Sequence, residues 1–331
     1  MSELARWAWH IEISSKCTLH CPRCPRQEHP DSLTNAELSL DFFKQNFTPL
    51  FVHKNVEKIM FCGNDGDPIY AHDLIPVVAY FKKIKPRLQI TIITNGSYKK
   101  PEWWAEFGQV LNSNDRVIFS IDGYDNTSNR LYRLNSDWDS IMQGITALRA
   151  NSECSLIWSA IPFSFNQDHL DKMESLAKEL GMNTFELSYS SKFGQAYAVD
   201  GIDPLEPRAD LTSTARYGKK TVNFIRPKST NTAIDLLVRS ASTIKPTNNV
   251  MPACSRGTGF GLYIDAAGRF FPCCWVATRY PHNAEWQDIS NGFNLTNIKL
   301  EQVLADNFWK EEFQDYRWQE CQTKCAVAQG H

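Results

Sequence analysis

The chain of 331 residues lacks several features that mark whole classes of protein. It has no apolar run of about 18 residues, the length of a transmembrane helix. Its first residues, Met-Ser-Glu-Leu-Ala-Arg-Trp, contain no apolar core of a secretory signal peptide. The formal net charge is only −2, so no field of the whole chain indicates nucleic acid or a membrane surface. These absences predict a cytoplasmic protein with neither a membrane nor a nucleic-acid partner.

Cysteine is also missing from one long part of the chain. The 10 cysteines fall into two groups, and none lies between Cys154 and Cys254. Without a secretion signal, a reducing compartment is expected, where clustered cysteines bind metal more often than they form disulfides.

The first group contains the spacing C-x3-C-x2-C in the segment Cys17-Thr-Leu-His-Cys21-Pro-Arg-Cys24. Three thiolates this close can hold three corners of a cubane iron–sulfur cluster. No fourth cysteine lies nearby, so one iron would be open to a small molecule. Two alternatives remain from the residues alone. Together with His20 the three cysteines could bind zinc, or they could be unrelated buried thiols.

Strands and helices alternate through the first 190 residues. The sequence predicts strands at 9–14, 56–61, 88–94, 116–121, 155–161 and 184–188, and helices at 40–47, 72–83, 102–111, 138–149 and 167–180. This order predicts an α/β fold with a parallel sheet, curved or closed like a barrel. Glycine-rich and polar segments follow the second, third and fourth strands, as the cysteines follow the first. All four therefore share the carboxyl ends of the strands, where βα barrels carry their active sites.

The cysteine loop, set among these strands, resembles that of the radical S-adenosylmethionine (radical SAM) superfamily. The resemblance implies a partial (β/α)6 TIM-type barrel and a [4Fe–4S] cluster on Cys17, Cys21 and Cys24. The open iron would then bind the methionine part of SAM. The segment Gly63-Asn64-Asp65-Gly66-Asp67-Pro68 is similar to the glycine–glycine–glutamate motif that contacts the methionine ammonium. The further SAM contacts that the resemblance implies are Asn95, Ser120, Asp122 and Arg133, with Arg130 as the alternative to Arg133.

The second group of cysteines looks like the auxiliary-cluster domain called twitch, the short relative of SPASM. A β-hairpin is predicted at 259–271 and a helix at 296–313. Cys273 fits the G-x4-C pattern better than Cys274 does, although a structural zinc is an alternative to a cluster. The implied ligands of a second [4Fe–4S] cluster are Cys254, Cys273, Cys321 and Cys325.

Three parts are expected: a radical SAM core at 1–190, a connection at 191–250 and a twitch-like domain at 251–331. The connection is rich in proline and polar residues, with one short helix predicted near 233–240. From Arg208 to Lys245 it is strongly cationic, either as a solvated linker or as a flap over an anionic substrate. Cys62 and Cys154 are expected to be buried hydrophobic residues, or else thiol hydrogen-atom donors.

The resemblance implies an enzyme that reductively cleaves SAM to a 5′-deoxyadenosyl radical and abstracts a hydrogen atom from its substrate. A saturated second cluster indicates a two-electron oxidation, hence a dehydrogenase-like oxidoreductase. A small-molecule substrate is expected because the first strand begins too early for a leader-binding domain, and the cationic stretch at 208–245 indicates an anionic, sugar-like one. An electron donor such as flavodoxin or ferredoxin is the expected partner. A peptide-modifying enzyme and a non-catalytic metal-binding protein are the alternatives.

Overall fold

The computed structural model describes residues 7–190, 192–211, 219–224, 262–278, 280 and 283–306. Its strands form one sheet in the order β7-β6-β5-β4-β3-β2-β1-β8-β9. Strands β1 to β6 are parallel to one another. Their bounds are β1 Trp7–Ile11, β2 Val56–Phe61, β3 Gln89–Thr94, β4 Arg116–Ser120, β5 Ser155–Ala160 and β6 Thr184–Ser188. The six predicted parallel strands are confirmed, and the sheet is open rather than closed.

Three further strands extend the sheet at its two edges. Strand β7 (Lys219–Asn223) pairs antiparallel with β6, strand β8 (Leu262–Ile264) pairs parallel with β1, and β9 (Phe270–Phe271) pairs antiparallel with β8. The predicted C-terminal hairpin is therefore present in its described part, and it continues the core sheet. The sequence predicted no strand in 191–250, and β7 corrects this. A short polar edge strand, Lys-Lys-Thr-Val-Asn, carries little periodic signal of its own.

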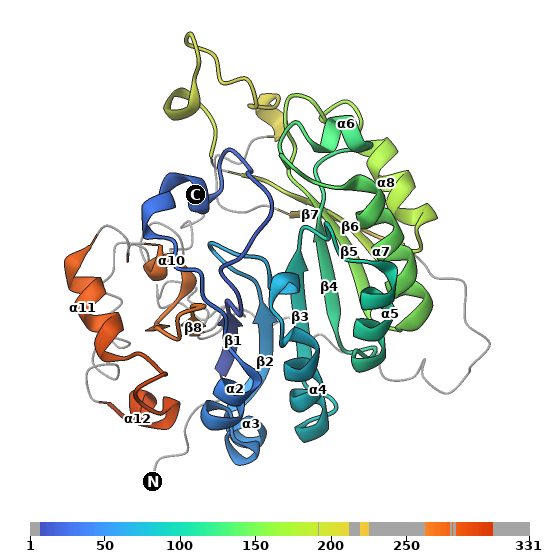
Figure 1. The fold of residues 1–331 in the computed structure, drawn as a ribbon. Coiled ribbons are helices and arrows are strands. Elements are labelled where there is room, and N and C mark those ends of the chain that lie inside the picture. Colours follow the sequence, from blue (N-terminus) through green and yellow to red (C-terminus); the bar gives the residue numbers. More distant parts are fainter. Residues whose placement is uncertain are drawn as a thin grey trace, which may run out of the picture.

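The helices lie mainly on one face of the sheet (Figure 1). Their bounds are α1 Pro25–Glu28, α2 Leu40–Asn46, α3 Pro49–Asn55, α4 Leu74–Ile84, α5 Pro101–Val110, α6 Asn126–Asn129, α7 Trp138–Asn151, α8 Leu170–Glu179, α10 Cys274–Ala277, α11 Ala284–Gly292 and α12 Leu300–Ala305, with short 3-10 turns at Pro30–Ser32, Pro68–Tyr70, Gln195–Tyr197 and Ala209–Leu211.

The five helices predicted in the core are found as α2, α4, α5, α7 and α8. Helices α3 and α11 were not predicted. Helix α12 confirms the start of the helix expected at 296–313, whose residues from 307 onward lie outside the described part, as does the helix expected at 233–240.

Alternating side chains give the sheet two different faces. Trp9 and Ile11 of β1, Phe61 of β2 and Phe119 of β4 are buried against the helices in the main hydrophobic core. On the other face, partly exposed polar residues such as Thr91, Ser120 and Ser159 stand between apolar ones. The core therefore fixes which residues face away from the helices. No described helix has the length and apolar character needed to cross a membrane.

Candidate functional site

The three cysteines of the predicted cluster loop lie together just after β1. Cys21 is buried and Cys17 and Cys24 are half-buried. The Cys24 amide donates to the Cys21 carbonyl at 3.1 Å, and Cys24 then starts helix α1, whose first residue is Pro25. Proline fits there because the first helical residue needs no amide donor. The loop thus turns back on itself and brings its three thiols toward one another.

The three thiols of the loop are largely shielded from water and influence one another's charge. Burial raises the pKa of all three, that of Cys17 to about 12, and Cys21 and Cys24 add to the effect on Cys17. Yet no three His, Cys, Asp or Glu side chains in the described residues are placed to hold one metal ion. The cluster and the zinc alternative for this loop therefore both stay predictions.

Neighbouring protein atoms leave no room for a side chain at the two glycines of the second motif. A Cβ on Gly66 would overlap the Ser14 carbonyl oxygen, and one on Gly63 would overlap the carboxylate of Glu12. Glu12 Oε1 accepts hydrogen bonds from the amides of Asp65 and Gly66, both at 2.8 Å. These close approaches lock the glycine-rich loop onto the end of β1, directly beside the cysteine loop.

Glu12 is a site residue that the sequence analysis missed. It is buried, and its second oxygen accepts a hydrogen bond from the Tyr263 hydroxyl of β8 at 2.8 Å. Burial, reinforced by nearby Asp65, raises the pKa of Glu12 to about 8. The sequence feature that could have identified Glu12 is its position: an acidic residue between Ile11 and Ile13, shortly before the cysteines. Alternation along the chain places it on the face opposite these two core residues.

Asp67 and Asn95, two of the predicted SAM contacts, bind each other. Asp67 Oδ2 accepts from the backbone and side-chain amides of Asn95, both at 2.6 Å, and Oδ1 accepts from the Ile69 amide at 3.2 Å. The Asn95 side-chain amide also lies 3.8 Å from the Cys17 sulfur. Burial raises the pKa of Asp67 to about 6. The structure therefore gives Asp67 a structural task beside the cysteines, and its contact with SAM stays a prediction.

Asp122 and Arg133 form a buried ion pair. Arg133 Nε donates to Asp122 Oδ2 at 2.6 Å, while Oδ1 accepts from the Ile161 amide at 2.7 Å. Burial raises the pKa of Cys21, and the positive charge of the nearby Arg133 guanidinium lowers it by a smaller amount. Arg130, the alternative to Arg133, is exposed. Of the two arginines, Arg133 is the one that the fold places beside the cysteine loop.

Ser120 belongs to a set of hydroxyls at the carboxyl ends of neighbouring strands. It is paired in register with Ser159 of β5, whose hydroxyl lies 3.1 Å from that of Ser188 of β6. All three are partly exposed. The sequence analysis selected only Ser120, although the same strand-end position carries serine in β5 and β6.

Arg23, inside the cysteine loop, is a second residue that the sequence analysis missed. Its guanidinium forms a buried ion pair with Asp203 and lies over the rings of Phe193 and Tyr197, at 5.0 and 4.5 Å. Asp203 also accepts from the amides of Gly194 at 3.0 Å and of Leu205, at 2.9 Å. The segment that follows the barrel is therefore fixed to the loop between Cys21 and Cys24.

The second cysteine group is described only in part. Cys273 and Cys274 are half-buried, at the start of α10, whereas Cys254, Cys321 and Cys325 lie outside the described residues. Asn64, a predicted SAM contact, donates through its side chain to the Cys274 carbonyl at 3.2 Å. Cys62 is near enough to Cys274 for the two thiols to influence each other's charge, and Cys154 is fully buried. The second cluster and its ligands stay a prediction.

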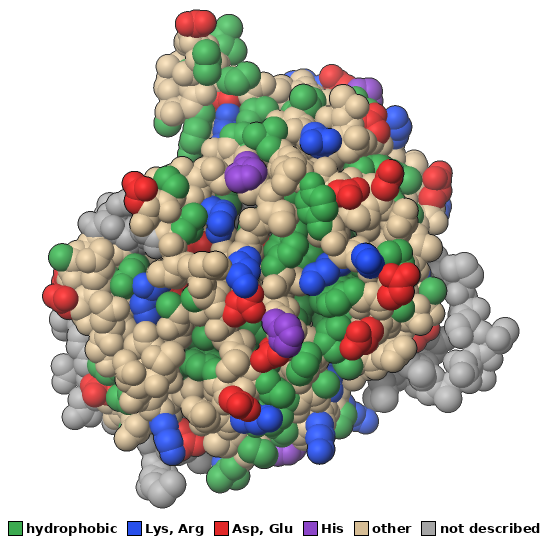
Figure 2. Space-filling model, viewed as in Figure 1, with side chains coloured by type: hydrophobic (Ala, Val, Ile, Leu, Met, Phe, Trp, Pro, Cys, Tyr) green, Lys and Arg blue, Asp and Glu red, His purple; other side chains and the backbone are tan. Residues whose placement is uncertain are grey.

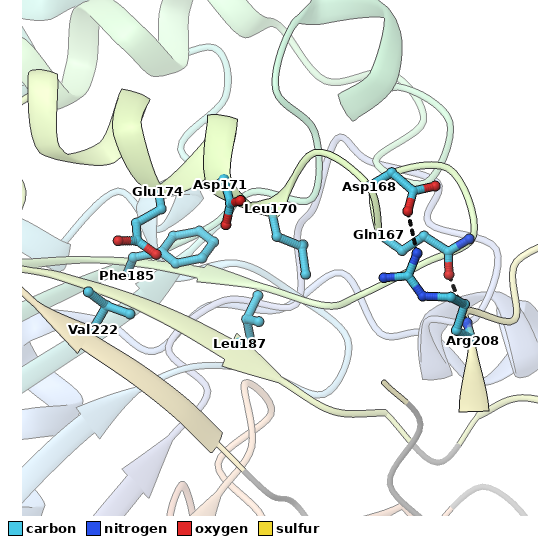
Figure 3. Close-up of a pocket in the computed structure, with 9 residues that line it drawn as sticks. All are labelled: Gln167, Asp168, Leu170, Asp171, Glu174, Phe185, Leu187, Arg208 and Val222. Atoms are coloured by element: carbon cyan, nitrogen blue, oxygen red, sulfur yellow. Dashed lines mark hydrogen bonds and ion pairs between the residues drawn. The ribbon is translucent and has the colours of Figure 1, made fainter. Parts of the chain in front are cut away.

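A pocket of about 320 Å³ lies at the other end of the sheet (Figure 3). Phe185, Leu187 and Val222 form its apolar floor, and Asp171 and Glu174 of α8 border it. Among the described residues that line it, the one cation is Arg208, which is bound to Asp168. Strands β6 and β7 lie toward one edge of the sheet, whereas β1, β8 and β9 lie toward the other.

Comparisons with known proteins identify the family. The Radical SAM superfamily matches residues 11–176, which is half of the chain and includes the three loop cysteines, Glu12, Asp67, Asn95, Asp122 and Arg133. A GTP 3′,8-cyclase of Limosilactobacillus fermentum is 31% identical over 117 residues. That match covers 34% of this chain and 33% of the cyclase, so it spans only a third of the relative.

Solved structures share the fold over most of the chain. Streptococcus suis SuiB is 15% identical, with a TM-score of 0.62 over 95% of this chain and 69% of SuiB. The protein anSMEcpe with bound AdoMet is 12% identical, with a TM-score of 0.52 over 92% of this chain and 82% of that one. The chain belongs to the radical SAM superfamily.

Proposed function

We propose that the chain cleaves SAM reductively and oxidises a small anionic substrate by two electrons. The observation that carries the proposal is the loop of Cys17, Cys21 and Cys24 at the carboxyl end of β1. The loop contains no fourth cysteine, and Arg133 lies beside Cys21. Cys17, Cys21 and Cys24 would hold a [4Fe–4S] cluster, which would supply the electron for cleaving SAM into methionine and a 5′-deoxyadenosyl radical.

The chain's own residues would bind and orient SAM. Arg133, positively charged beside Cys21, is suited to pair with the methionine carboxylate. The hydroxyls of Ser120, Ser159 and Ser188 can serve as donors or acceptors to the ribose or the substrate. Glu12 and Asp67 act on the glycine-rich loop and hold its backbone in place for the ammonium group. A second cluster, if held by Cys254, Cys273, Cys321 and Cys325 as the sequence predicts, would accept the electron that the oxidation releases.

Two observations bear on the substrate. The cationic stretch from Arg208 to Lys245 and a relative whose name includes a nucleotide, GTP, both favour an anionic small molecule. A peptide substrate is the second candidate. SuiB and anSMEcpe, whose folds match nearly all of this chain, have both been solved with peptides bound.

Iron analysis and SAM cleavage test the proposal together. Reconstituted without oxygen, the chain should hold about eight irons and eight sulfides, and dithionite should drive slow formation of 5′-deoxyadenosine. Replacing Cys17, Cys21 and Cys24 with Ala should leave about four of each and abolish the nucleoside. Replacing buried Cys154 with Ala is the matched control and should change neither. Stoichiometric zinc without iron in protein purified anaerobically would contradict the proposal.

A further inference from the structure

A tyrosine from the C-terminal part of the chain lies beside the residues that hold the glycine-rich loop, 63–68. Tyr263 belongs to β8, which pairs parallel with β1 and lies next to it in Figure 1. In the register of this pairing, Tyr263 is opposite His10 of β1. Tyr263 and Glu12 are 251 residues apart in the sequence, and the strand pairing brings them into contact.

Two side chains hold the glycine-rich loop from the β1 side, and Tyr263 contacts both. His10 Nε2 donates to the Cys62 carbonyl at 3.0 Å, where the loop begins. Glu12 Oε1 accepts from two backbone amides in the middle of the loop, both at 2.8 Å. The Tyr263 hydroxyl donates to Glu12 Oε2 at 2.8 Å, and its ring packs edge to face against the His10 ring, with centroids 4.9 Å apart.

These three side chains are shielded from water, so a lost contact has no ready substitute. Charged side chains of both signs lie on the surface in Figure 2, whereas Glu12, His10 and Tyr263 are exposed by only 2, 6 and 1%. Among the described residues, His10 Nδ1 makes no hydrogen bond, so the ring depends on Nε2 and on its packing. A buried oxygen that loses its donor pays the full cost of its desolvation. Loss of the Tyr263 hydroxyl should therefore shift the Glu12 carboxyl, whose other oxygen holds the loop.

The same C-terminal part makes a second contact with the loop. Asn64 donates through its side chain to the Cys274 carbonyl at 3.2 Å, at the start of α10. A Cβ on Gly63 would lie 2.2 Å from Glu12 Oε1, so the loop fits closely against the carboxyl group that Tyr263 holds. Small movements of this carboxyl group should therefore be transmitted to the loop backbone.

We propose that Tyr263 is a positioning residue for SAM, acting through Glu12 to hold the glycine-rich loop in its binding conformation. The inference rests on the proposed function, in which this loop meets the methionine ammonium. Hydrogen bonds to the loop amides fix the direction of the neighbouring carbonyl groups, which can accept from an ammonium. Tyr263 lies outside the family match at 11–176, so β8 would supply part of the SAM site from beyond the matched core.

The test removes one hydroxyl and keeps the ring, in the variant Tyr263→Phe. Reconstituted full chains are compared in two measurements: the SAM dissociation constant by calorimetry, and hydrogen–deuterium exchange of the amides of 63–68 without SAM. Tyr80→Phe is the matched control, because the Tyr80 hydroxyl also makes one hydrogen bond, to the Phe47 carbonyl at 2.9 Å, between α4 and the end of α2. Glu12→Leu, with and without Tyr263→Phe, tests whether Glu12 transmits the effect.

Tyr263→Phe should raise the SAM dissociation constant about tenfold and speed amide exchange in 63–68 by about the same factor. Tyr80→Phe should match the wild type in both measurements. In the Glu12→Leu background, Tyr263→Phe should change neither measurement by more than about twofold, because the link it acts through is gone.

Wild-type SAM affinity in Tyr263→Phe would overturn the proposal, and so would a tenfold effect that persists in the Glu12→Leu background. Faster exchange spread evenly over the core, rather than confined to 63–68, would indicate general destabilisation and would also overturn it. A wild type that binds SAM but forms no 5′-deoxyadenosine would overturn the proposed function alone.

Discussion

Removing Arg133 should damage the fold as well as SAM binding. In the ion pair, the Asp122 side chain is fully buried and that of Arg133 is 17% exposed. In Arg133→Met, the Asp122 carboxylate loses its counter-ion and keeps the hydrogen bond from the Ile161 amide to Oδ1. Breaking a buried pair from one side costs about 3–5 kcal/mol, because the other charge is left without its counter-ion. A loss of SAM binding in this variant alone would therefore prove nothing about a direct contact.

A double-mutant cycle separates the two roles. Asp122→Asn keeps the shape and removes the charge, so the double variant Arg133→Met/Asp122→Asn buries no lone charge. We expect its free energy of unfolding to exceed that of Arg133→Met, with a coupling energy of about 2–3 kcal/mol. SAM affinity is then measured by calorimetry on the reconstituted proteins. If Arg133 pairs with the SAM carboxylate, affinity should fall by about 1.5–3 kcal/mol in the double variant although its fold is restored.

Two results would refute this reasoning. Strictly additive unfolding energies would mean that the ion pair contributes nothing as a pair. Wild-type SAM affinity in the double variant would mean that Arg133 only positions the loop, and Arg130 would then be tested by Arg130→Met. Asp122→Asn alone serves as the control for the loss of its charge.

Three further predictions follow from the same contacts. Arg23→Met should destabilise the protein by about 3–5 kcal/mol and speed the loss of iron to a chelator, because Asp203 is left without its counter-ion. Adding Asp203→Asn should reverse part of both effects. Iron release at the wild-type rate in Arg23→Met would contradict this prediction. The pKa of Glu12 is raised from 4.5 to about 8. The stability that Glu12 contributes relative to Glu12→Gln should therefore be full below pH 4.5 and be lost as the pH rises toward 8. Denaturant unfolding across this pH range measures the difference, and a difference that does not change with pH would refute the prediction. Cys273→Ser should remove about four irons while Cys274→Ser should not, and the reverse result would exchange the assigned ligand.

Much of the fold could be predicted because its signals are local. Strands with alternating burial, such as β3 (Gln89–Thr94), alternate with amphipathic helices, and the cysteine spacing is itself a local pattern. Strand β7 was missed because an edge strand needs only one partner, and its pairing with β6 depends on residues far away in sequence. The place of the C-terminal hairpin was missed for the same reason, since β8 joins the sheet beside β1.

The site could be predicted by residue type but not by partner. Asp122 and Arg133 were both expected near SAM, yet nothing in the sequence showed that they neutralise each other. Arg23 lies between two cysteines of the loop, but its role depends on its ion pair with Asp203, which follows β6 in the sequence. Long-range pairs of this kind leave no periodic or motif signal, because either residue alone is ordinary.

The cysteine loop is fixed from three directions by residues that belong to none of its own turns. Glu12 and the glycine-rich loop hold its β1 side, the pair of Asp122 and Arg133 lies beside Cys21, and Asp203 holds Arg23. None of these links is made by a cysteine sulfur alone, so each can form from the polypeptide itself. Metal sites often form only as metal binds. Here the surrounding charges and amides contribute to the loop's shape, so cluster binding would not have to order the loop alone.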